Sequence, residues 1–239
     1  MTARPSHWAW DDGHTSMDCE RIVSGFLGQP ANAVSSLAFL VSAAWILTLA
    51  FRRESTPRVA LFVFAIAVAA NAVGSFALHG PDPSWAQWAH DLAIMAVLLF
   101  IVVHAFGRML GWRPTVQIGA YAIGLVAVGL GLAAFHGASD PFAGTLAAGA
   151  VVGEATTSSS ERRGPPPAGR RSGSVARRIG LVAIAMGGVA YLLGQTGSPL
   201  CRPESLFQWH SLWHVLVAVS LLAYAYVLSA RPRGPAARA

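Results

Sequence analysis

The chain has 239 residues and a formal net charge of +6; 54% of its residues are hydrophobic and only 12% are charged. A soluble domain carries about 25% charged residues, so this composition excludes an ordinary soluble domain and indicates a protein that resides in lipid. All basic residues are arginines, and they stand in short clusters between apolar runs. Such clusters are typical of membrane topology signals and argue against nucleic acid as a partner.

Seven apolar runs follow a polar N-terminal segment, residues 1–30, in which we expect no cleaved signal peptide. Most of these runs reach the roughly 20 residues that a helix needs to cross a bilayer. We therefore predict an all-α fold, a seven-transmembrane helix bundle over residues 31–229. The predicted spans are residues 31–51, 59–79, 85–106, 115–135, 141–155, 179–197 and 206–229.

The fifth run is shorter than the others, so its helix is either shielded from lipid by its neighbours or extends through residues 156–160. Its status as a span depends on the arginines around it. If it crosses the membrane, every arginine except Arg4, Arg21 and Arg202 lies on one side, as expected for the cytoplasmic side. We therefore predict an N-terminus outside and a C-terminus inside. The use of arginine without lysine, beside many alanines and glycines, suggests a bacterial inner membrane protein with multiple spans.

Three polar stretches complete this topology. Residues 1–30 form the predicted extracytoplasmic N-terminal segment. Residues 156–178 are rich in Ser, Pro, Gly and Arg and lack apolar residues for a core, so they predict a disordered cytoplasmic loop. Residues 230–239 have a similar composition and form the predicted cytoplasmic tail.

The two cysteines, Cys19 and Cys201, both fall on the outer side of the membrane in this topology. An extracytoplasmic compartment permits disulfide bonds, so we expect a bridge that ties the N-terminal segment to the start of the seventh span. The alternative is two unrelated thiols.

Two histidines, His210 and His214, stand four residues apart at the start of the seventh span. This spacing places them on one face of a helix, where both can bind one metal ion. The alternative is a pair of interfacial histidines beside Trp209 and Trp213 in an aromatic belt.

Further polar residues converge on the same membrane depth. Ser75 and His79 share a helix face at the outer end of the second span, and Asp91 lies about two turns into the third. Because the seventh span also enters from outside, His210 and His214 lie at the same level. Three neutral imidazoles suit zinc and leave its fourth position for water. The alternative is a set of polar residues that only join the helices.

The set Ser75-x-x-x-His79, Asp91 and His210-x-x-x-His214 resembles the alkaline ceramidase family. That family belongs to a seven-helix membrane superfamily that also includes adiponectin-receptor-like proteins. The resemblance implies a seven-helix fold and a zinc-dependent hydrolase that cleaves the amide bond of a ceramide-like N-acyl lipid. It therefore implies Zn²⁺ as cofactor and a membrane lipid as substrate.

The N-terminal segment extends this resemblance. Asp18-Cys19-Glu20 and Asn32-Ala-Val-Ser35 are similar to the family's Trp-Cys-Glu and Asn-x-x-Ser patterns. The family's cysteine pair also matches the two cysteines of this chain, which supports the disulfide bond. The resemblance thus covers most of the chain, from before the first span to the seventh.

The resemblance assigns a role to each residue of the set. His79, His210 and His214 would be the zinc ligands. Asp91 would hold or deprotonate the attacking water and pass its proton to the leaving amine. Ser75 would donate a hydrogen bond to the oxygen on which negative charge develops.

Calcium is a second ion that the resemblance implies, through the acidic N-terminal segment of animal members. Asp18 and Glu20 are the candidate calcium ligands here. Two further ligand positions of the family carry Ile22 and Gln29, which have no carboxylate, so the sequence provides only part of that site.

Two other function classes stay open at this point. One is a seven-helix receptor-like or sensor protein that keeps zinc for structural reasons. The other is a helical bundle that binds haem or transports a metal ion, although two histidines on one helix face suit a small ion better than haem.

Overall fold

The computed structural model describes residues 18–52, 56–135, 139–163 and 170–230. This part of the chain is helical apart from its loops and one isolated β-bridge, between Asp18 and Gln195. Its helices are α1 (Pro30–Ser35), α2 (Leu37–Phe51), α3 (Thr56–His79), α4 (Ala86–Met109), α5 (Pro114–Ala134), α6 (Ser139–Arg163), α7 (Arg170–Leu193) and α8 (Trp209–Ala230). The prediction of an all-α fold is confirmed, whereas expectations for residues 1–17 and 231–239 lie outside the described residues.

Within the described residues, six helical segments are long and apolar enough to cross a membrane: α1 with α2, and α3, α4, α5, α7 and α8. Large apolar side chains remain uncovered on their outer faces, for example Ile123 and Leu130 of α5, which are 73% and 67% exposed. A helix forms all its backbone hydrogen bonds internally and can present such side chains to lipid. The chain is therefore a multi-pass membrane protein.

The predicted loop after the fifth span is wrong over most of its length. α6 continues to Arg163 and α7 already begins at Arg170, so the larger part of residues 156–178 is helical. A helix that has formed extends at low cost per residue. Thr157 fits into it because its hydroxyl donates to the Gly153 carbonyl oxygen at 3.0 Å. The residues between α6 and α7 lie outside the described residues.

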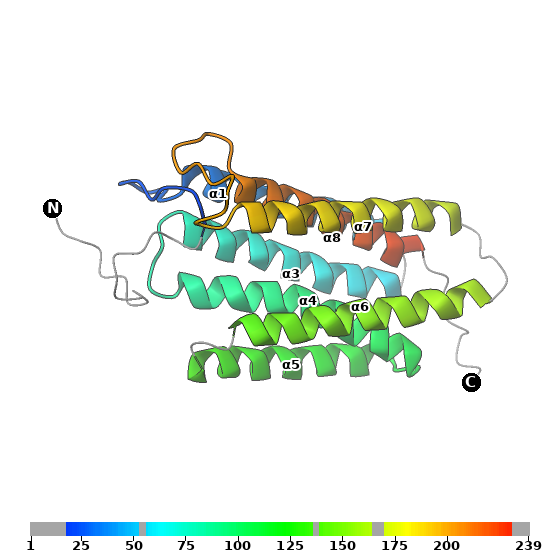
Figure 1. The fold of residues 1–239 in the computed structure, drawn as a ribbon. Coiled ribbons are helices and arrows are strands. Elements are labelled where there is room, and N and C mark those ends of the chain that lie inside the picture. Colours follow the sequence, from blue (N-terminus) through cyan, green and yellow to red (C-terminus); the bar gives the residue numbers. More distant parts are fainter. Residues whose placement is uncertain (1–17, 53–55, 136–138, 164–169, 231–239) are drawn as a thin grey trace.

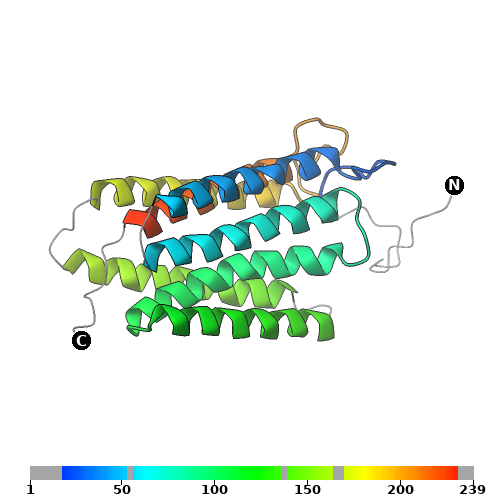
Figure 2. The same ribbon diagram turned by 180° about the vertical axis from the view of Figure 1, so that it is seen from behind.

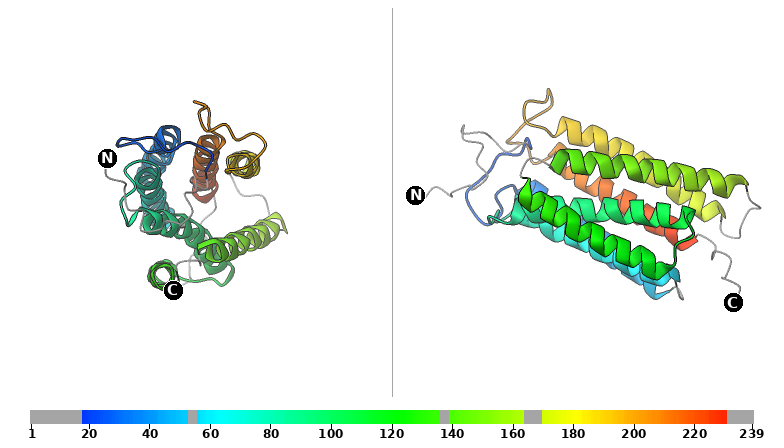
Figure 3. Two further views of the ribbon diagram at one scale, coloured as in Figure 1. Left: turned by 60° about the vertical axis from the view of Figure 1, so that its left-hand side comes forward. Right: turned by 90° about the horizontal axis from the view of Figure 1, so that it is seen from below.

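The helices lie side by side as a bundle, seen lengthwise in Figure 1 and from two further directions in Figure 3. α4 packs against α3 on one side and against α5 and α6 on the other, while α7 packs along α8. α8 also contacts α1, α2 and α3, and the view from behind shows α2 running along it (Figure 2). Residues 18–29 and the loop between α7 and α8 lie together at one end of the bundle, whereas α8 finishes at the opposite end (Figure 1).

An apolar core fills the bundle between α2, α3, α4 and α8. Its largest fully buried members are Ile46 of α2 and Leu61, Phe64 and Val68 of α3, all with no exposed surface. Close packing of these side chains holds α3 beside α8. Four buried polar residues of the two helices, Ser75, His79, His210 and His214, lie instead towards the end of the bundle where α3 ends and α8 begins.

Candidate metal centre

Three histidines from two helices meet at this end of the bundle. His79 is the last residue of α3, and His210 and His214 lie in the first two turns of α8. One ring nitrogen from each lies within 4.8 Å of the others, and the residues are only 2%, 7% and 2% exposed, respectively. The structure thus brings together the three residues that the sequence predicts as metal ligands.

Two glycines allow the helices to approach closely around the histidines. A Cβ atom at Gly74 of α3 would lie 2.9 Å from the backbone of both Ala89 and His90 in α4. A Cβ atom at Gly194, just after α7, would lie 2.7 Å from the backbone nitrogen of His210. A side chain at either position would therefore force apart the elements that frame the triad.

Each imidazole has a different partner at its Nδ1 atom. Gln29 Oε1 lies 2.7 Å from His79 Nδ1, and Ser35 Oγ lies 2.8 Å from His214 Nδ1. Ser35 donates its own proton to the carbonyl oxygen of Asn32 at 2.9 Å, so it accepts from His214. Both rings are then neutral tautomers with the proton on Nδ1, which leaves a lone pair on Nε2.

The third ring, His210, faces a carboxylate. Asp18 Oδ1 lies 2.8 Å from His210 Nδ1, and Asp18 Oδ2 lies 3.8 Å from His79 Nδ1. The shorter contact is close but does not reach the angle of a hydrogen bond, since His210 Nδ1 has no such bond among the described residues. Asp18 therefore lies across the Nδ1 edges of two of the three imidazoles.

The Nε2 atoms lack such partners. Among the described residues, the buried Nε2 atoms of His79 and His210 make no hydrogen bond, and His214 Nε2 has only Ser75 Oγ at 3.4 Å. Buried polar atoms are nearly always paired in proteins, so unpaired nitrogens in a cluster of three histidines make this site a candidate for a bound ligand. Three neutral imidazoles fit a zinc ion in chemistry and number.

Ser75, a predicted catalytic residue, lies beside this centre. It is fully buried one turn before His79, and its Oγ lies 2.8 Å from Ser36 Oγ. Ser36 donates to the carbonyl oxygen of Asn32 at 2.9 Å, so it accepts from Ser75. The Ser75 proton is thus held by one neutral hydroxyl and can turn to another acceptor.

Asp91, the other predicted catalytic residue, is engaged with its own helix. Its Oδ1 lies 3.0 Å from His90 Nδ1 and accepts a hydrogen bond from Gln87 Nε2 at 2.9 Å. The His90 ring in turn stands edge-on to the His79 ring, 6.1 Å between centroids. The structure connects Asp91 to the triad through His90, and the catalytic role of Asp91 stays a prediction.

Glu20, a predicted calcium ligand, caps α1. Its two carboxylate oxygens accept hydrogen bonds from the backbone nitrogens of Ala31 and Asn32 at 2.7 and 2.8 Å. A carboxylate at a helix N-terminus is stabilised by these N–H groups and by the helix dipole. Since the Asp18 carboxylate contacts the histidines instead, the two acidic residues have separate partners, and calcium binding stays a prediction.

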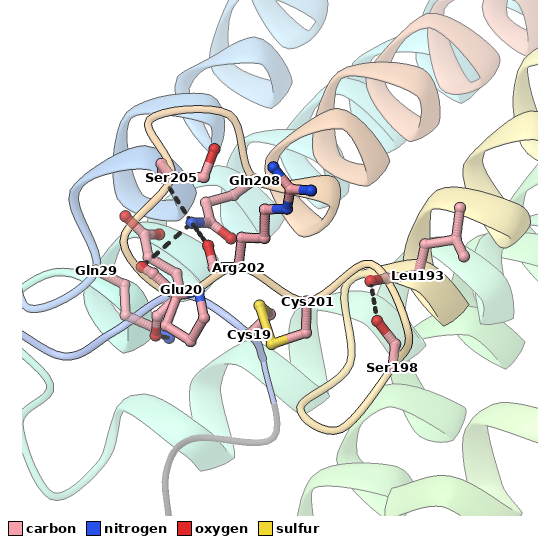
Figure 4. Close-up of a disulfide and its surroundings, with 10 residues drawn as sticks. Cys19, Glu20, Gln29, Leu193, Ser198, Cys201, Arg202, Ser205 and Gln208 are labelled. Atoms are coloured by element: carbon pink, nitrogen blue, oxygen red, sulfur yellow. Dashed lines mark hydrogen bonds between the residues drawn. A yellow bond between two sulfur atoms is a disulfide. The ribbon is translucent and has the colours of Figure 1, made fainter.

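The predicted disulfide bond is confirmed: Cys19 is bonded to Cys201 (Figure 4). It joins the N-terminal segment to the loop that links α7 and α8. Gln208 organises this loop by donating to the carbonyl oxygens of Arg202, Pro203 and Ser205 at 3.2, 3.4 and 2.7 Å. The bridge thus fixes the segment of Asp18 and Glu20 to the chain that leads into His210.

Sequence reasoning did not find Gln29 and Ser36 as neighbours of the site, and for His90 it favours an interfacial position over a role beside the metal ligands. Gln29 enters the sequence analysis only as a lost calcium ligand, and His90 lies about 100° around an ideal helix from Asp91. One signal for Ser36 was available in the sequence. It directly follows Ser35, the last residue of the Asn-x-x-Ser pattern.

Comparison of the chain with protein-family models, with curated proteins and with solved structures finds no match. The residues of the site, their contacts and their burial therefore provide the grounds for assigning a function.

Proposed function

We propose that this protein is a zinc-dependent integral membrane hydrolase that cleaves the amide bond of a ceramide-like N-acyl lipid. The observation that carries the proposal is the buried triad of His79, His210 and His214, whose donor atoms lie within 4.8 Å of one another. The similarity of this triad, with Ser75 and Asp91, to the alkaline ceramidase motif supports an amide as the bond that is cut.

The proposal includes a topology of seven spans, in which α6 is the fifth. α6 has 25 residues, enough to cross a bilayer, and it packs along the membrane-type helix α4. The N-terminal segment and the end of α8 lie at opposite ends of the bundle (Figure 1), as an odd number of spans requires. The arginine distribution supports an outer N-terminus and an inner C-terminus, in a bacterial inner membrane.

In this proposal the three Nε2 atoms hold the zinc ion, and the Nδ1 partners fix the tautomer and orientation of each ring. When bound, zinc lowers the pKa of a water molecule to about 7 and polarises a carbonyl group. Asp91 takes a proton from the attacking water and delivers it to the leaving amine. Ser75 turns its proton from Ser36 to the substrate carbonyl oxygen as negative charge develops there.

The location of the triad favours a lipid substrate. The histidines lie within two turns of one end of the bundle, at the proposed outer surface. Helices α2, α3 and α8 below them are apolar, so an acyl chain can lie along them while its amide group reaches the triad. We expect the substrate to enter from the outer leaflet.

A second function, a receptor-like or sensor protein with a structural zinc site, is favoured by one observation. The three imidazoles are at most 7% exposed, because residues 18–29 and α1 cover them. Such burial is expected of a zinc ion that stabilises the fold and does not meet a substrate. Hydrolysis of an N-acyl lipid by the purified protein distinguishes the two functions.

The test uses the full chain in detergent, with zinc measured by elemental analysis and hydrolysis followed on a fluorescent N-acyl sphingosine. We expect about one zinc per chain in the wild type, and loss of zinc and activity in His79→Ala and His214→Ala. Ser75→Ala should keep its zinc and lose about 100-fold in kcat. Wild-type protein that binds no zinc would exclude the metal site. Zinc without hydrolysis of any long-chain N-acyl lipid would favour the sensor.

A further inference from the structure

Asp18 lies in the most firmly anchored part of the N-terminal segment. It forms the β-bridge with Gln195, and its neighbour Cys19 donates its backbone N–H to the Gly194 carbonyl oxygen at 2.8 Å. Cys19 is also bonded to Cys201. These contacts involve the backbone or the disulfide, so the Asp18 main chain is held against the end of α7 independently of its carboxylate.

The Asp18 carboxylate points at the Nδ1 edges of His210 and His79, at 2.8 and 3.8 Å. On the opposite edges, the Nε2 atoms of both rings make no hydrogen bond among the described residues, and His210 Nδ1 itself makes none with the angle of a hydrogen bond. A carboxylate on the Nδ1 side does not compete for the position that a metal ion takes on the Nε2 side. Its geometry is that of an outer partner of the ligands, and a small rotation of the His210 ring would align its N–H with Oδ1.

The partners of the other two rings are neutral: the amide of Gln29 faces His79 and the hydroxyl of Ser35 faces His214. An ionised acceptor strengthens a hydrogen bond from an imidazole N–H about twofold relative to a neutral one. It also makes the opposite nitrogen a more basic ligand, which is how carboxylate–histidine–zinc arrangements raise metal affinity. Asp18 can therefore increase the metal affinity of His210 by making its Nε2 atom a more basic ligand.

We propose that Asp18 is a positioning residue of the metal centre, which raises zinc affinity by holding His210, and secondarily His79, through their Nδ1 atoms. This inference rests on the proposed zinc site and assigns to Asp18 a role separate from calcium binding. It also gives the disulfide bond a function in the site, since the bridge fixes the residue that follows Asp18.

The experiment compares Asp18→Ala and Asp18→Asn with the wild type in the full chain, purified in detergent. Glu204→Gln is the matched control, because Glu204 is an exposed acid of the neighbouring loop, 73% accessible, paired with Arg21 at 2.6 Å. Three quantities are measured: the zinc dissociation constant by competition with a chelator, the d–d absorption spectrum of the cobalt-substituted protein, and the thermal unfolding of the metal-free protein.

We expect Asp18→Ala to weaken zinc binding at least about 10-fold and to change the cobalt spectrum, with metal-free unfolding unchanged. Asp18→Asn keeps an acceptor oxygen but loses the charge, so it should fall between the wild type and Asp18→Ala. Glu204→Gln should match the wild type in all three measurements.

Two results would overturn the inference while leaving the proposed function intact. In the first, the wild type binds zinc, and Asp18→Ala has the same zinc affinity and the same cobalt spectrum as the wild type. The other is a loss of affinity that is matched by a lower unfolding temperature of the metal-free variant, which would indicate a structural role. Wild-type protein that binds no zinc would instead overturn the proposed function itself.

Discussion

Gln29 and His79 are joined by two hydrogen-bonding contacts. The Gln29 side-chain Oε1 lies 2.7 Å from His79 Nδ1, and the Gln29 backbone N–H donates to the His79 carbonyl oxygen at 2.7 Å. The Gln29 amide also donates to the Glu20 carbonyl oxygen at 2.8 Å. One residue before α1 thus secures both the end of α3 and the orientation of the imidazole there.

Replacing Gln29 should therefore weaken the metal site. In Gln29→Ala the backbone contact remains but the acceptor for His79 Nδ1 is lost, so the ring is free to rotate. We expect zinc affinity to fall about 10-fold, as for other outer partners of metal ligands, when measured by chelator competition. Gln117→Ala is the control, because Gln117 lies in α5, away from the histidines, and its side chain donates to the Trp112 carbonyl oxygen. Equal affinity of Gln29→Ala and the wild type would contradict this role.

The disulfide bond should contribute substantially to stability. Cys19 and Cys201 are 182 residues apart, so their bond closes a long loop in the unfolded chain, an effect worth about 2–4 kcal/mol. We expect reductant to lower the unfolding temperature of the wild type. The double variant Cys19→Ser/Cys201→Ser should begin at the lower value and not respond to reductant. A wild type that unfolds identically with and without reductant would show that the bond adds no stability.

Gly194 should tolerate no side chain. A Cβ atom there would lie 2.7 Å from the backbone nitrogen of His210, and the resulting shift of α8 would cost about 1–3 kcal/mol. We expect Gly194→Ala to lower the unfolding temperature and to weaken zinc binding. Gly188→Ala, towards the end of α7 with no atom of another segment within 4 Å of its Cβ position, should instead be neutral or gain up to about 1 kcal/mol in helix propensity. A similar decrease in unfolding temperature and zinc binding in both variants would refute the steric explanation.

Asp91 should affect catalysis more than metal binding. Asp91→Asn keeps the size of the side chain but cannot take up a proton, so we expect kcat to fall about 100-fold or more with one zinc per chain retained. Asp140→Asn, which alters an exposed carboxylate at the start of α6, should leave kcat unchanged. Loss of zinc from Asp91→Asn would instead indicate that Asp91 holds the site through His90.

The sequence by itself determined the helices and the general location of the site. Apolar runs of about 20 residues can satisfy their backbone only as membrane helices, and α3, α4 and α8 begin and end within a few residues of the prediction. The four-residue spacing of His210 and His214 requires a common helix face, and the order of spans brings His79 to the same level. The prediction of a disordered loop failed for residues 156–163 and 170–178, where a polar composition conceals the end of α6 and the start of α7.

Only the tertiary structure decided which atoms surround the imidazoles. The partners Asp18, Gln29 and Ser35 precede the α8 histidines by almost the whole chain, and no helical periodicity relates them. Their positions depend on how residues 18–29 fold over the end of the bundle, where the disulfide bond, the bridge to Gln195 and the Glu20 cap of α1 hold them. These are contacts between distant segments, so the local sequence pattern carries no information about which nitrogen of each histidine is left for a metal ion.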